Sequence, residues 1–398
     1  MRILIANEAL SGHGGVETYL AALISALQHA GHDVGVLHQN TAKVEHEPHA
    51  IASHDTWRVG VEDVGLDEAI RRVRSFAPDV CFSHNMRSLE IESQLLAGWP
   101  VVKMMHGHFG TCISGHKMLA FPSSVACTRD FGTGCFTHYW TRRCGQANPV
   151  RVMRAYEWSK SQRGLLPEYH SLVVASRYMR DQYLRTGVTH AHVHAIPLFA
   201  PRVAEPAEHN GHRSIDVIFV GRLTNLKGPD VVIDAVARAM PRVGRPMNVV
   251  FAGDGPERDY VREYATTRGV NARFTGWITA AERDTLLSDS TMLAVPSRWP
   301  EPFGLVGLEA AARGTPAVAF NTGGIRDWLT DDENGRLVAP SDDKGFADAI
   351  ADIATKPALH ARLSAGAREA ASRFTVEAYL RALVPVLTSA AGRSVEAS

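Results

Sequence analysis

The sequence lacks a long hydrophobic run, a net charge and any cysteine pair in C-x2-C spacing. No stretch reaches the roughly 18 apolar residues that a membrane-spanning helix needs, so no transmembrane segment is expected. The N-terminal stretch "MRILIANEALSGHGG" has one basic residue and a short apolar run, which predicts a first strand rather than a secretory signal. We therefore expect a cytoplasmic protein, in which disulfides are disfavoured.

The charged residues balance, with 42 Lys and Arg against 42 Asp and Glu. This balance argues against a protein that binds polyanions through its overall charge. Hydrophobic residues make up 45% of the chain, which is typical of a globular protein. The chain has 398 residues, more than one ordinary core holds, so two domains are expected.

Short apolar segments alternate with segments of helical periodicity through both halves of the chain. Such segments are buried on both faces when they form a parallel sheet covered by helices. The predicted strands of the first half are 2–6, 32–38, 78–84, 100–106, 171–176 and 191–198. Those of the second half are 216–222, 248–255, 272–277, 291–297 and 316–320. The pattern predicts an α/β protein with two doubly wound domains in tandem.

Two segments interrupt the alternation and set the predicted domain boundaries. Residues 107–165 lack regular periodicity and hold four of the five cysteines, which predicts an insertion. Residues 199–214 are rich in Pro, Glu and His and predict a linker. We therefore expect an N-terminal domain over 1–198, a second domain over 215–375 and a closing helical segment over 376–398.

The segment "PSRWPEPFGLVGLEAAARG" (296–314) follows a predicted strand and opens a helix near Gly304. Unpaired N–H groups at the start of that helix favour an anion such as a phosphate, and the glycine allows close approach. The carboxylates of Glu301 and Glu309 would repel a phosphate and accept hydrogen bonds from hydroxyls instead. A nucleoside diphosphate sugar satisfies both demands. The alternative is a capped helix with one exposed and one salt-bridged glutamate.

Two further strand-to-helix junctions carry groups that suit a diphosphate. Arg222 ends the strand in "VGRLTNLKGPDVVIDAV" (220–236), and Lys227 follows just before a helix. An exposed basic loop is the alternative for these cations. Gly14 and Gly15 follow the first strand without the full G-x-G-x-x-G spacing of a dinucleotide fingerprint, and fit a loop whose backbone faces a diphosphate.

The segments "RWPEPFGLVGLEAAARGTPAVAFNTGGIRDWL", "FVGRLTNLKGPDVVIDA" and "FAGDGPERD" resemble the donor domain of retaining GT-B glycosyltransferases of family 4. Glu301 and Glu309 match the E-x7-E motif of that family. Arg222 and Lys227 match its diphosphate-binding pair, and the glycine pair after the first strand matches its N-terminal glycine loop. The resemblance covers most of the chain and is strongest from 216 to 340.

The resemblance implies a GT-B fold, in which two Rossmann-like domains face each other across a cleft. The first domain would bind the acceptor and the second the donor, and the final helix would cross back onto the first domain. The implied reaction transfers a sugar from a UDP- or GDP-sugar with retention of anomeric configuration. Its oxocarbenium-like transition state needs charge stabilisation and positioning, and no catalytic metal is expected because cations of the chain hold the diphosphate.

The catalytic roles implied by the resemblance fall to His106, Glu301, Arg222 and Lys227. His106 ends a predicted strand of the first domain, within His106-Gly107-His108 where relatives carry His-Asp-His. The aspartate of that signature is therefore absent here. His84 follows another strand that matches the family, and its predicted role is structural support or lining of the acceptor side.

The donor is expected to contact residues of both domains, with its base near Trp277 and Ile278. The predicted binding residues are Gly14, Gly15, Arg222, Lys227, Trp277, Ile278, Phe303, Gly304, Leu305, Val306 and Glu309. The sugar, the base and the acceptor stay open, and a polysaccharide, a lipid-linked carrier or a small molecule fits as acceptor. The alternatives are a GT-B sugar-nucleotide epimerase or phosphorylase, or a non-catalytic sugar-nucleotide-binding subunit.

The four cysteines of the insertion are candidate ligands for a structural zinc ion. Cys112, Cys127, Cys135 and Cys144 supply enough thiolates for a tetrahedral site, but their spacing contains no C-x2-C pair. Disulfide or redox chemistry and unlinked thiols are the alternatives. Cys81 lies within a predicted strand and is expected to be a buried apolar residue.

A basic and aromatic stretch closes the insertion. Residues 141–164 carry six Lys and Arg against one Glu, with Tyr156 and Trp158 among them. Such a stretch can rest on anionic lipid headgroups, so a peripheral membrane contact is one expectation and a solvated helix face the other. No base-reading module is recognisable, so no nucleic-acid partner is expected.

Overall fold

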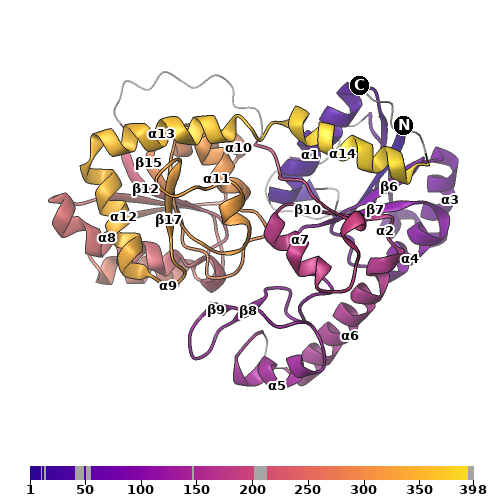
Figure 1. The fold of residues 1–398 in the computed structure, drawn as a ribbon, viewed down its shortest axis with the longest axis horizontal. Helices are drawn as coiled ribbons and strands as arrows, with labels where there is room; N and C mark the ends of the chain where they lie inside the picture. The colour runs from indigo at the N-terminus through magenta and orange to yellow at the C-terminus, as the bar shows by residue number, and fades with distance from the viewer. Residues whose placement is uncertain are drawn as a thin grey trace.

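The computed structural model describes residues 1–9, 11–12, 15–40, 49–50, 55–145, 148–200 and 213–392. Two parallel β-sheets with flanking helices lie side by side, and a smaller lobe projects from the first (Figure 1). Gly14 and positions 201–212 of the predicted linker lie outside the described residues. The predicted class, two doubly wound α/β domains, is confirmed.

The first sheet has seven parallel strands in the order β11-β10-β7-β6-β1-β3-β5. In chain order these are β1 (Arg2–Ala9), β3 (Asp33–Asn40), β5 (Trp57–Gly60), β6 (Val80–Ser83), β7 (Val101–Met105), β10 (Ser171–Val174) and β11 (Val193–Ala195). Its helices are α1 (Gly15–His29), α2 (Val61–Val64), α3 (Leu66–Phe76), α4 (Leu89–Gly98) and α7 (Arg177–Leu184), with 3-10 turns η1 (Leu166–Glu168) and η2 (His190–His192). A separate short pair joins β2 (Ser11–Gly12) to β4 (His49–Ala50).

The second sheet has six parallel strands in the order β14-β13-β12-β15-β16-β17. In chain order these are β12 (Ile215–Val220), β13 (Asn248–Ala252), β14 (Asn271–Gly276), β15 (Ser290–Val295), β16 (Ala317–Phe320) and β17 (Gly335–Val338). Its helices are α8 (Pro229–Val243), α9 (Arg258–Thr267), α10 (Ala280–Ser288), α11 (Leu305–Ala311), α12 (Asp343–Thr355) and α13 (Pro357–Ala371), with 3-10 turns η3 (Asn225–Lys227) and η4 (Gly323–Asp327).

Each sheet is buried on both faces, as its apolar runs require. Along β1, Ile3 and Ile5 join one hydrophobic cluster, and Leu4 joins another on the opposite face. Ile218 of β12 belongs to the same cluster as Ile3 and Ile5, so one continuous core runs between the two sheets. The two domains therefore pack directly against each other through a shared hydrophobic core.

Two edge strands are absent from the sequence prediction. β5 has four residues, of which Val59 and Gly60 are buried, so it shows too little apolar periodicity to be recognised. β17 contains Arg336 and is paired on one side only, against β16. Edge strands are short and half-solvated, which explains why a search for buried apolar runs misses them.

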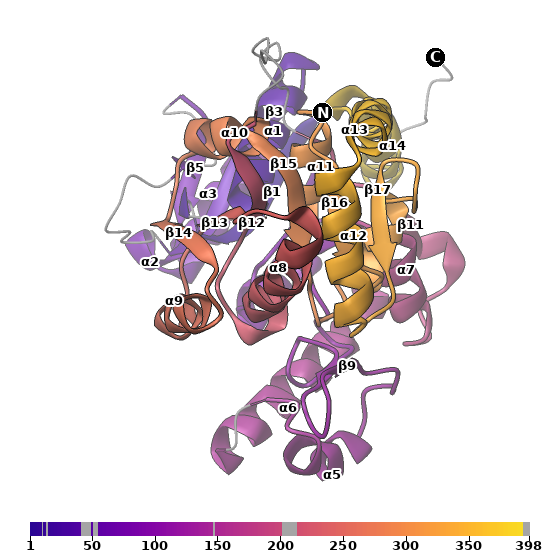
Figure 2. The same cartoon turned by 90° about the vertical axis from the view of Figure 1, so that its left-hand side faces the viewer.

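The predicted insertion forms the lobe, defined here as residues 107–165, which extends below the sheets in both views (Figures 1 and 2). It contains the two-residue strands β8 (Met118–Leu119) and β9 (Val125–Ala126) and the helices α5 (Gly134–Thr141) and α6 (Pro149–Leu165). Asn148 caps α6 by accepting hydrogen bonds from two N–H groups of its first turn. No helix in the described part of the chain is long and apolar enough to cross a membrane.

The last helix, α14 (Val376–Ala390), lies against the first domain rather than the second (Figure 1). It contacts α1, β6 and β7. Tyr379 shares a buried hydrogen bond of 2.5 Å with Tyr19 of α1, between the two hydroxyl oxygens. This crossing ties the end of the chain to the first sheet and helps to fix the two domains relative to each other.

Candidate active site

A cavity of about 580 Å3 lies where the carboxyl ends of strands from both sheets meet. Ligands of open parallel sheets bind at these strand ends. Every predicted catalytic or donor-binding residue that the structure describes lines this cavity. They are Gly15, His106, Arg222, Lys227, Trp277, Ile278, Glu301, Phe303, Gly304, Leu305, Val306 and Glu309.

The loop after β15 carries Glu301 into the cavity and then turns sharply into α11. Gly304 makes this turn at a φ of 89°, and a Cβ there would lie 2.8 Å from Ile325. Gly323 packs so closely beneath the loop that a Cβ there would lie 2.2 Å from the carbonyl oxygen of Glu301. Only glycine fits both positions, because of the backbone angle and the contact. The two glycines therefore fix where the glutamate side chain can lie.

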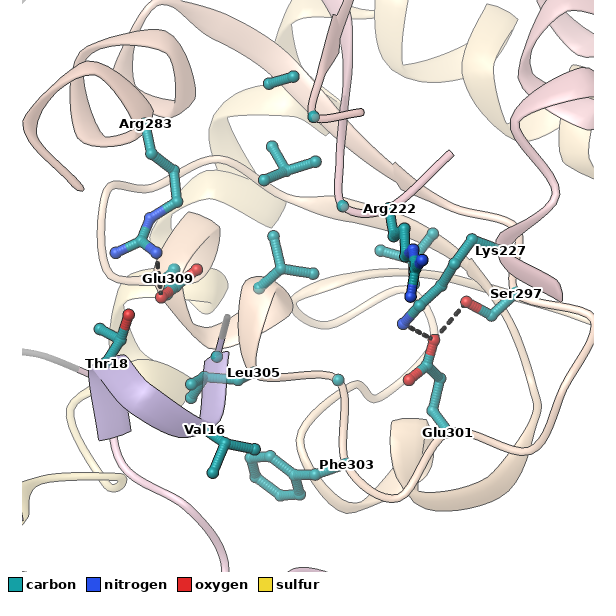
Figure 3. A pocket seen from close by; sticks show the side chains of 18 of the residues that line it. Val16, Thr18, Arg222, Lys227, Arg283, Ser297, Glu301, Phe303, Leu305 and Glu309 are labelled. Atoms are coloured by element: carbon teal, nitrogen blue, oxygen red, sulfur yellow. Dashed lines mark hydrogen bonds and ion pairs between the residues drawn. The ribbon is translucent and has the colours of Figure 1, made fainter. Parts of the chain in front are cut away.

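Glu301 and Lys227 form an ion pair within the cavity (Figure 3). The Lys227 Nζ lies 2.6 Å from Glu301 Oε1, and the hydroxyl of Ser297 donates to the same oxygen over 2.5 Å. The ammonium also lies 5.4 Å from the ring centroid of Trp299. The sequence prediction assigned these two charges to different parts of the ligand, whereas the structure pairs them with each other.

Arg222 follows the end of β12 and is drawn beside Lys227 in the same view (Figure 3). Lys227 comes from the end of η3, and the N-terminus of α8 follows it. Gly228 begins that helix at a φ of 67°, and a Cβ there would lie 2.4 Å from the carbonyl oxygen of Pro296. The close packing holds the turn that carries Lys227 against the Glu301 loop, so the ammonium of Lys227 lies on the same side of the cavity as the carboxylate of Glu301.

Glu309 lies on the opposite side of the cavity and pairs with Arg283 of α10 (Figure 3). The Arg283 Nη1 lies 3.1 Å from Glu309 Oε1. Burial raises the pKa of the Glu309 carboxyl, although the charges of Arg283 and Arg313 oppose that effect. The sequence analysis missed Arg283, because an arginine inside an amphipathic helix looks like an ordinary surface charge.

His106 follows β7 and brings the first domain to the cavity. Its Nε2 shares a hydrogen bond of 3.0 Å with Nδ1 of His84, which follows β6. Tyr19 packs against both rings. Burial, with a smaller contribution from the charge of Lys103, lowers the pKa of His106 to about 3. Both imidazoles are therefore neutral near pH 7, and each can offer one N–H donor and one acceptor.

The Glu301 loop is held by residues of the first domain on both sides of the glutamate. The Nε2 of His108 lies 3.3 Å from the carbonyl oxygen of Pro300, and the hydroxyl of Ser176 donates to that of Pro302 over 2.6 Å. His108 is fully buried, and burial is the main cause that lowers its pKa to about 4. Contacts between the domains therefore position the carboxylate that faces the cavity, a connection that the sequence analysis did not predict.

The four cysteines of the lobe are not arranged as a metal site. Within the described ranges, no three or more His, Cys, Asp or Glu side chains are placed to hold a metal ion. Cys135 and Cys144 pack into the small lobe core, and the Cys112 sulfur accepts a hydrogen bond from the Lys117 N–H. Burial is the main cause that raises the pKa of Cys144 to about 11, and charge repulsion from the other three thiols adds to this effect. The thiols are thus near one another and unlinked, and zinc binding stays a prediction that this structure does not support.

Comparison with known proteins matches each half of the chain to a family of glycosyltransferases. The profile of the family described as Glycosyltransferase Family 4 matches residues 13–200, and that described as Glycosyl transferases group 1 matches residues 204–370. The protein is therefore a glycosyltransferase with the two Rossmann-like domains of the GT-B fold. More narrowly, the chain belongs to the group 1 glycosyltransferases.

Similar sequences include two differently named enzymes that match different shares of the chain. The glycogen synthase of Mycobacterium tuberculosis is 27% identical over 381 residues, which cover 89% of this chain and 86% of that protein. The D-inositol 3-phosphate glycosyltransferase of Saccharomonospora viridis is 35% identical over 188 residues, or 44% of this chain and 43% of that protein. The match is thus spread over the chain in one case and confined to less than half of it in the other.

Solved structures share the whole fold at low identity. The sucrose-phosphate synthase of Thermosynechococcus elongatus superposes with a TM-score of 0.69 at 22% identity, over 98% of each chain. Anabaena HepE in complex with UDP and glucose superposes with a TM-score of 0.68 at 17% identity, over 98% of this chain and 100% of that one. At these identities the likeness establishes the architecture alone.

Proposed function

We propose that this protein is a retaining glycosyltransferase whose donor is a UDP- or GDP-sugar and whose acceptor is a carbohydrate, lipid-linked or small-molecule hydroxyl. The observation that carries the proposal is a single cavity in which each side combines positive charge with a carboxylate, Lys227 with Glu301 on one side and Arg283 with Glu309 on the other. Arg222 and Lys227 supply positive charge at the ends of β12 and η3, and Glu301 and Glu309 supply carboxylates for hydroxyl groups. The HepE structure, which holds UDP and glucose, supports a donor of this class.

The cations would stabilise the leaving nucleoside diphosphate. Negative charge gathers on the diphosphate as the bond to the sugar breaks, and Arg222 and Lys227 lie where they can offset it. The first N–H groups of α11, at Leu305 and Val306, have no partners within the helix, and both residues line the cavity. Loss of one such contact costs on the order of 3 kcal/mol, or roughly a 100-fold lower rate.

The carboxylates would hold the sugar and the ribose. A diphosphate that draws Lys227 away from Glu301 leaves the Oε1 of that glutamate ready to accept a hydrogen bond from a sugar hydroxyl. Glu309, which pairs with Arg283, would accept hydrogen bonds from the ribose, and the base would lie against Trp277 and Ile278, which line the cavity. His106 faces this space from the first domain, the side that would receive the acceptor.

A donor panel with a glutamate variant tests the proposal. Purified protein is incubated with UDP-, GDP- and ADP-sugars and a mixture of glycan, inositol and lipid-linked acceptors, and nucleoside diphosphate release is measured. We expect release that depends on the acceptor and falls at least 100-fold in Glu301→Ala, while Glu333→Ala, an exposed glutamate outside the cavity, stays active. NMR of the product should show the anomeric configuration of the donor.

Three results would contradict the proposal. Full activity in a folded Glu301→Ala variant removes the assigned site. A new sugar nucleotide formed without any acceptor identifies an epimerase. Tight donor binding with no turnover for any acceptor identifies a non-catalytic binding subunit.

A further inference from the structure

The lobe concentrates exposed apolar side chains that the rest of the molecule buries. It holds about a seventh of the chain. Among the described residues, seven large hydrophobic side chains are exposed, and five of them belong to the lobe. These five are Phe121, Val125, Trp140, Val150 and Met153, with exposed fractions between 39% and 60%. The other two, Tyr260 and Trp277, lie in the second domain.

The same lobe is strongly basic in a chain without net charge. It contains eight Lys and Arg against two Asp and Glu. Arg143, Arg151, Arg154 and Lys160 are exposed on or just before α6. The guanidinium of Arg143 lies 5.1 Å from the ring centroid of Phe121, so cation and aromatic ring share one part of the surface. Positive charge and apolar groups thus occur together here.

The shape of the lobe favours a lipid surface over a protein partner. α5 and α6 extend away from both sheets in the two views (Figures 1 and 2). Trp140 belongs to the last turn of α5 and Val150 to the first turn of α6. Separate exposed apolar side chains interspersed with arginines suit a fluid interface, whereas a stable protein interface needs a larger and continuous buried patch.

We propose that the lobe docks on the surface of a membrane that contains anionic lipids. Arginine side chains would pair with headgroup phosphates, and the aromatic and aliphatic side chains would enter the boundary between headgroups and acyl chains. Because the whole chain has no net charge and the lobe has an excess of Lys and Arg, the electrostatic attraction to anionic lipids comes from the lobe. No spanning helix is involved, and binding is expected to be reversible and weakened by salt.

The docking surface is connected to the active-site cavity through two histidines of the lobe. The rings of His108 and His116 each lie 6.3 Å, between centroids, from Trp299, which lines the cavity. The lobe therefore borders the cavity where it joins the first domain, and docking through its projecting part would hold the cavity above the bilayer at the distance that the lobe projects. This step rests on the proposed function and assigns the acceptor to a class: a hydroxyl carried by a membrane lipid or a lipid-linked glycan.

Vesicle sedimentation tests the docking surface. The full chain is mixed with vesicles of phosphatidylcholine alone or with 40% phosphatidylglycerol, at low and high salt, roughly 50 and 300 mM, chosen to span the screening range. We expect at least tenfold more bound protein on the anionic vesicles at low salt. The variant Arg143→Gln/Arg151→Gln/Arg154→Gln should lose this difference, and Trp140→Ser/Val150→Ser/Met153→Ser should bind at least fivefold less.

Matched controls change the same chemistry elsewhere. Arg71→Gln/Arg72→Gln/Arg74→Gln removes three exposed arginines from α3, and Tyr260→Ser removes an exposed aromatic side chain from α9; both should bind vesicles like the original protein. Should the apolar triple variant fail to fold, Val150→Ser alone, at the most exposed of these positions, replaces it.

The outcomes separate docking from the proposed function. Equal binding to neutral and anionic vesicles, or full binding by the arginine variant, overturns the docking proposal. So does a dimer in solution that the apolar triple variant abolishes, because the patch would then be covered by a second copy. The shift of melting temperature with nucleoside diphosphates is measured on every variant. A shift without vesicle binding refutes the docking alone, whereas vesicle binding without any nucleotide shift refutes the proposed donor.

Discussion

At the scale of single residues, the cavity is organised by charges that compensate one another. Lys227 pairs with Glu301, and Arg283 with Glu309, so neither carboxylate is left buried without a partner. The Lys227 side chain is about one-third exposed, so it has room to move from Glu301 toward a more highly charged anion such as a diphosphate. A diphosphate that draws the ammonium away would therefore leave the buried carboxylate of Glu301 in need of another hydrogen-bond donor, such as a sugar hydroxyl.

Removal of the Lys227 ammonium should weaken nucleoside diphosphate binding. A hydrogen bond between charged groups contributes about 1.5–3 kcal/mol, so Lys227→Ala should raise the Kd of UDP or GDP roughly 10- to 150-fold. Calorimetric titration measures this change. Lys344→Ala, which removes an exposed lysine at the start of α12, should leave the Kd unaltered. An unchanged Kd in Lys227→Ala would show that the diphosphate lies elsewhere.

At the scale of elements, the loop between β15 and α11 is shared by the two domains. Its conformation comes from Gly304 and Gly323, but its position depends on His108 and Ser176 of the first domain. Relative movement of the domains would break these two hydrogen bonds and release the loop. A change in the relative position of the domains would therefore also change the placement of Glu301.

Loss of the hydrogen bond from His108 should slow turnover more than it weakens donor binding. His108→Ala removes a contact of about 1 kcal/mol to the loop, so we expect kcat to fall about fivefold while the Kd of the nucleoside diphosphate changes less than twofold. His108→Gln, which keeps an N–H donor, should restore much of kcat. A purely structural effect would instead lower the melting temperature of both variants alike and move kcat and Kd together.

At the scale of the whole molecule, stability should depend on pH through histidines buried at the domain boundary. Burial lowers the pKa of His106 to about 3 and that of His108 to about 4, and holds that of His84 well below 6.5. These groups bind fewer protons in the folded state than in the unfolded state. Their stabilising contribution is full above pH 6.5 and is lost as the pH falls toward the folded values.

We therefore expect the melting temperature to fall steeply between pH 6.5 and pH 4. Each of these histidines contributes up to about 1.4 kcal/mol per pH unit to the decline. Calorimetry across this range should show a smaller slope for His108→Gln, and an unaltered slope for His29→Gln on the exposed side of α1. Equal slopes in all three proteins would mean that His108 titrates alike in the folded and unfolded states.

Much of the architecture could be predicted from the sequence because its signals are local. The buried apolar runs of β1, β7, β12 and β15 predict parallel strands. Arg222 and Glu301 follow the ends of β12 and β15, which predicts that both lie at the same edge of one sheet. The edge strands β5 and β17 escaped prediction because they are short and partly polar. The lobe was recognised as an insertion, but its four thiols could not be arranged from spacing alone.

The fold class and the kinds of residue at the site follow from local sequence, because periodicity and strand-end residues are properties of adjacent positions. Which of these groups meet depends on the packing of distant segments. Lys227 and Glu301 are 74 positions apart, and His108 and Pro300 are 192 apart. Contacts over such distances depend on how two sheets pack, and many packings are compatible with the same local pattern. Three features could therefore be found only in the folded molecule. They are the ion pairs of the cavity, the hydrogen bonds from the first domain to the Glu301 loop, and the exposed apolar side chains of the lobe.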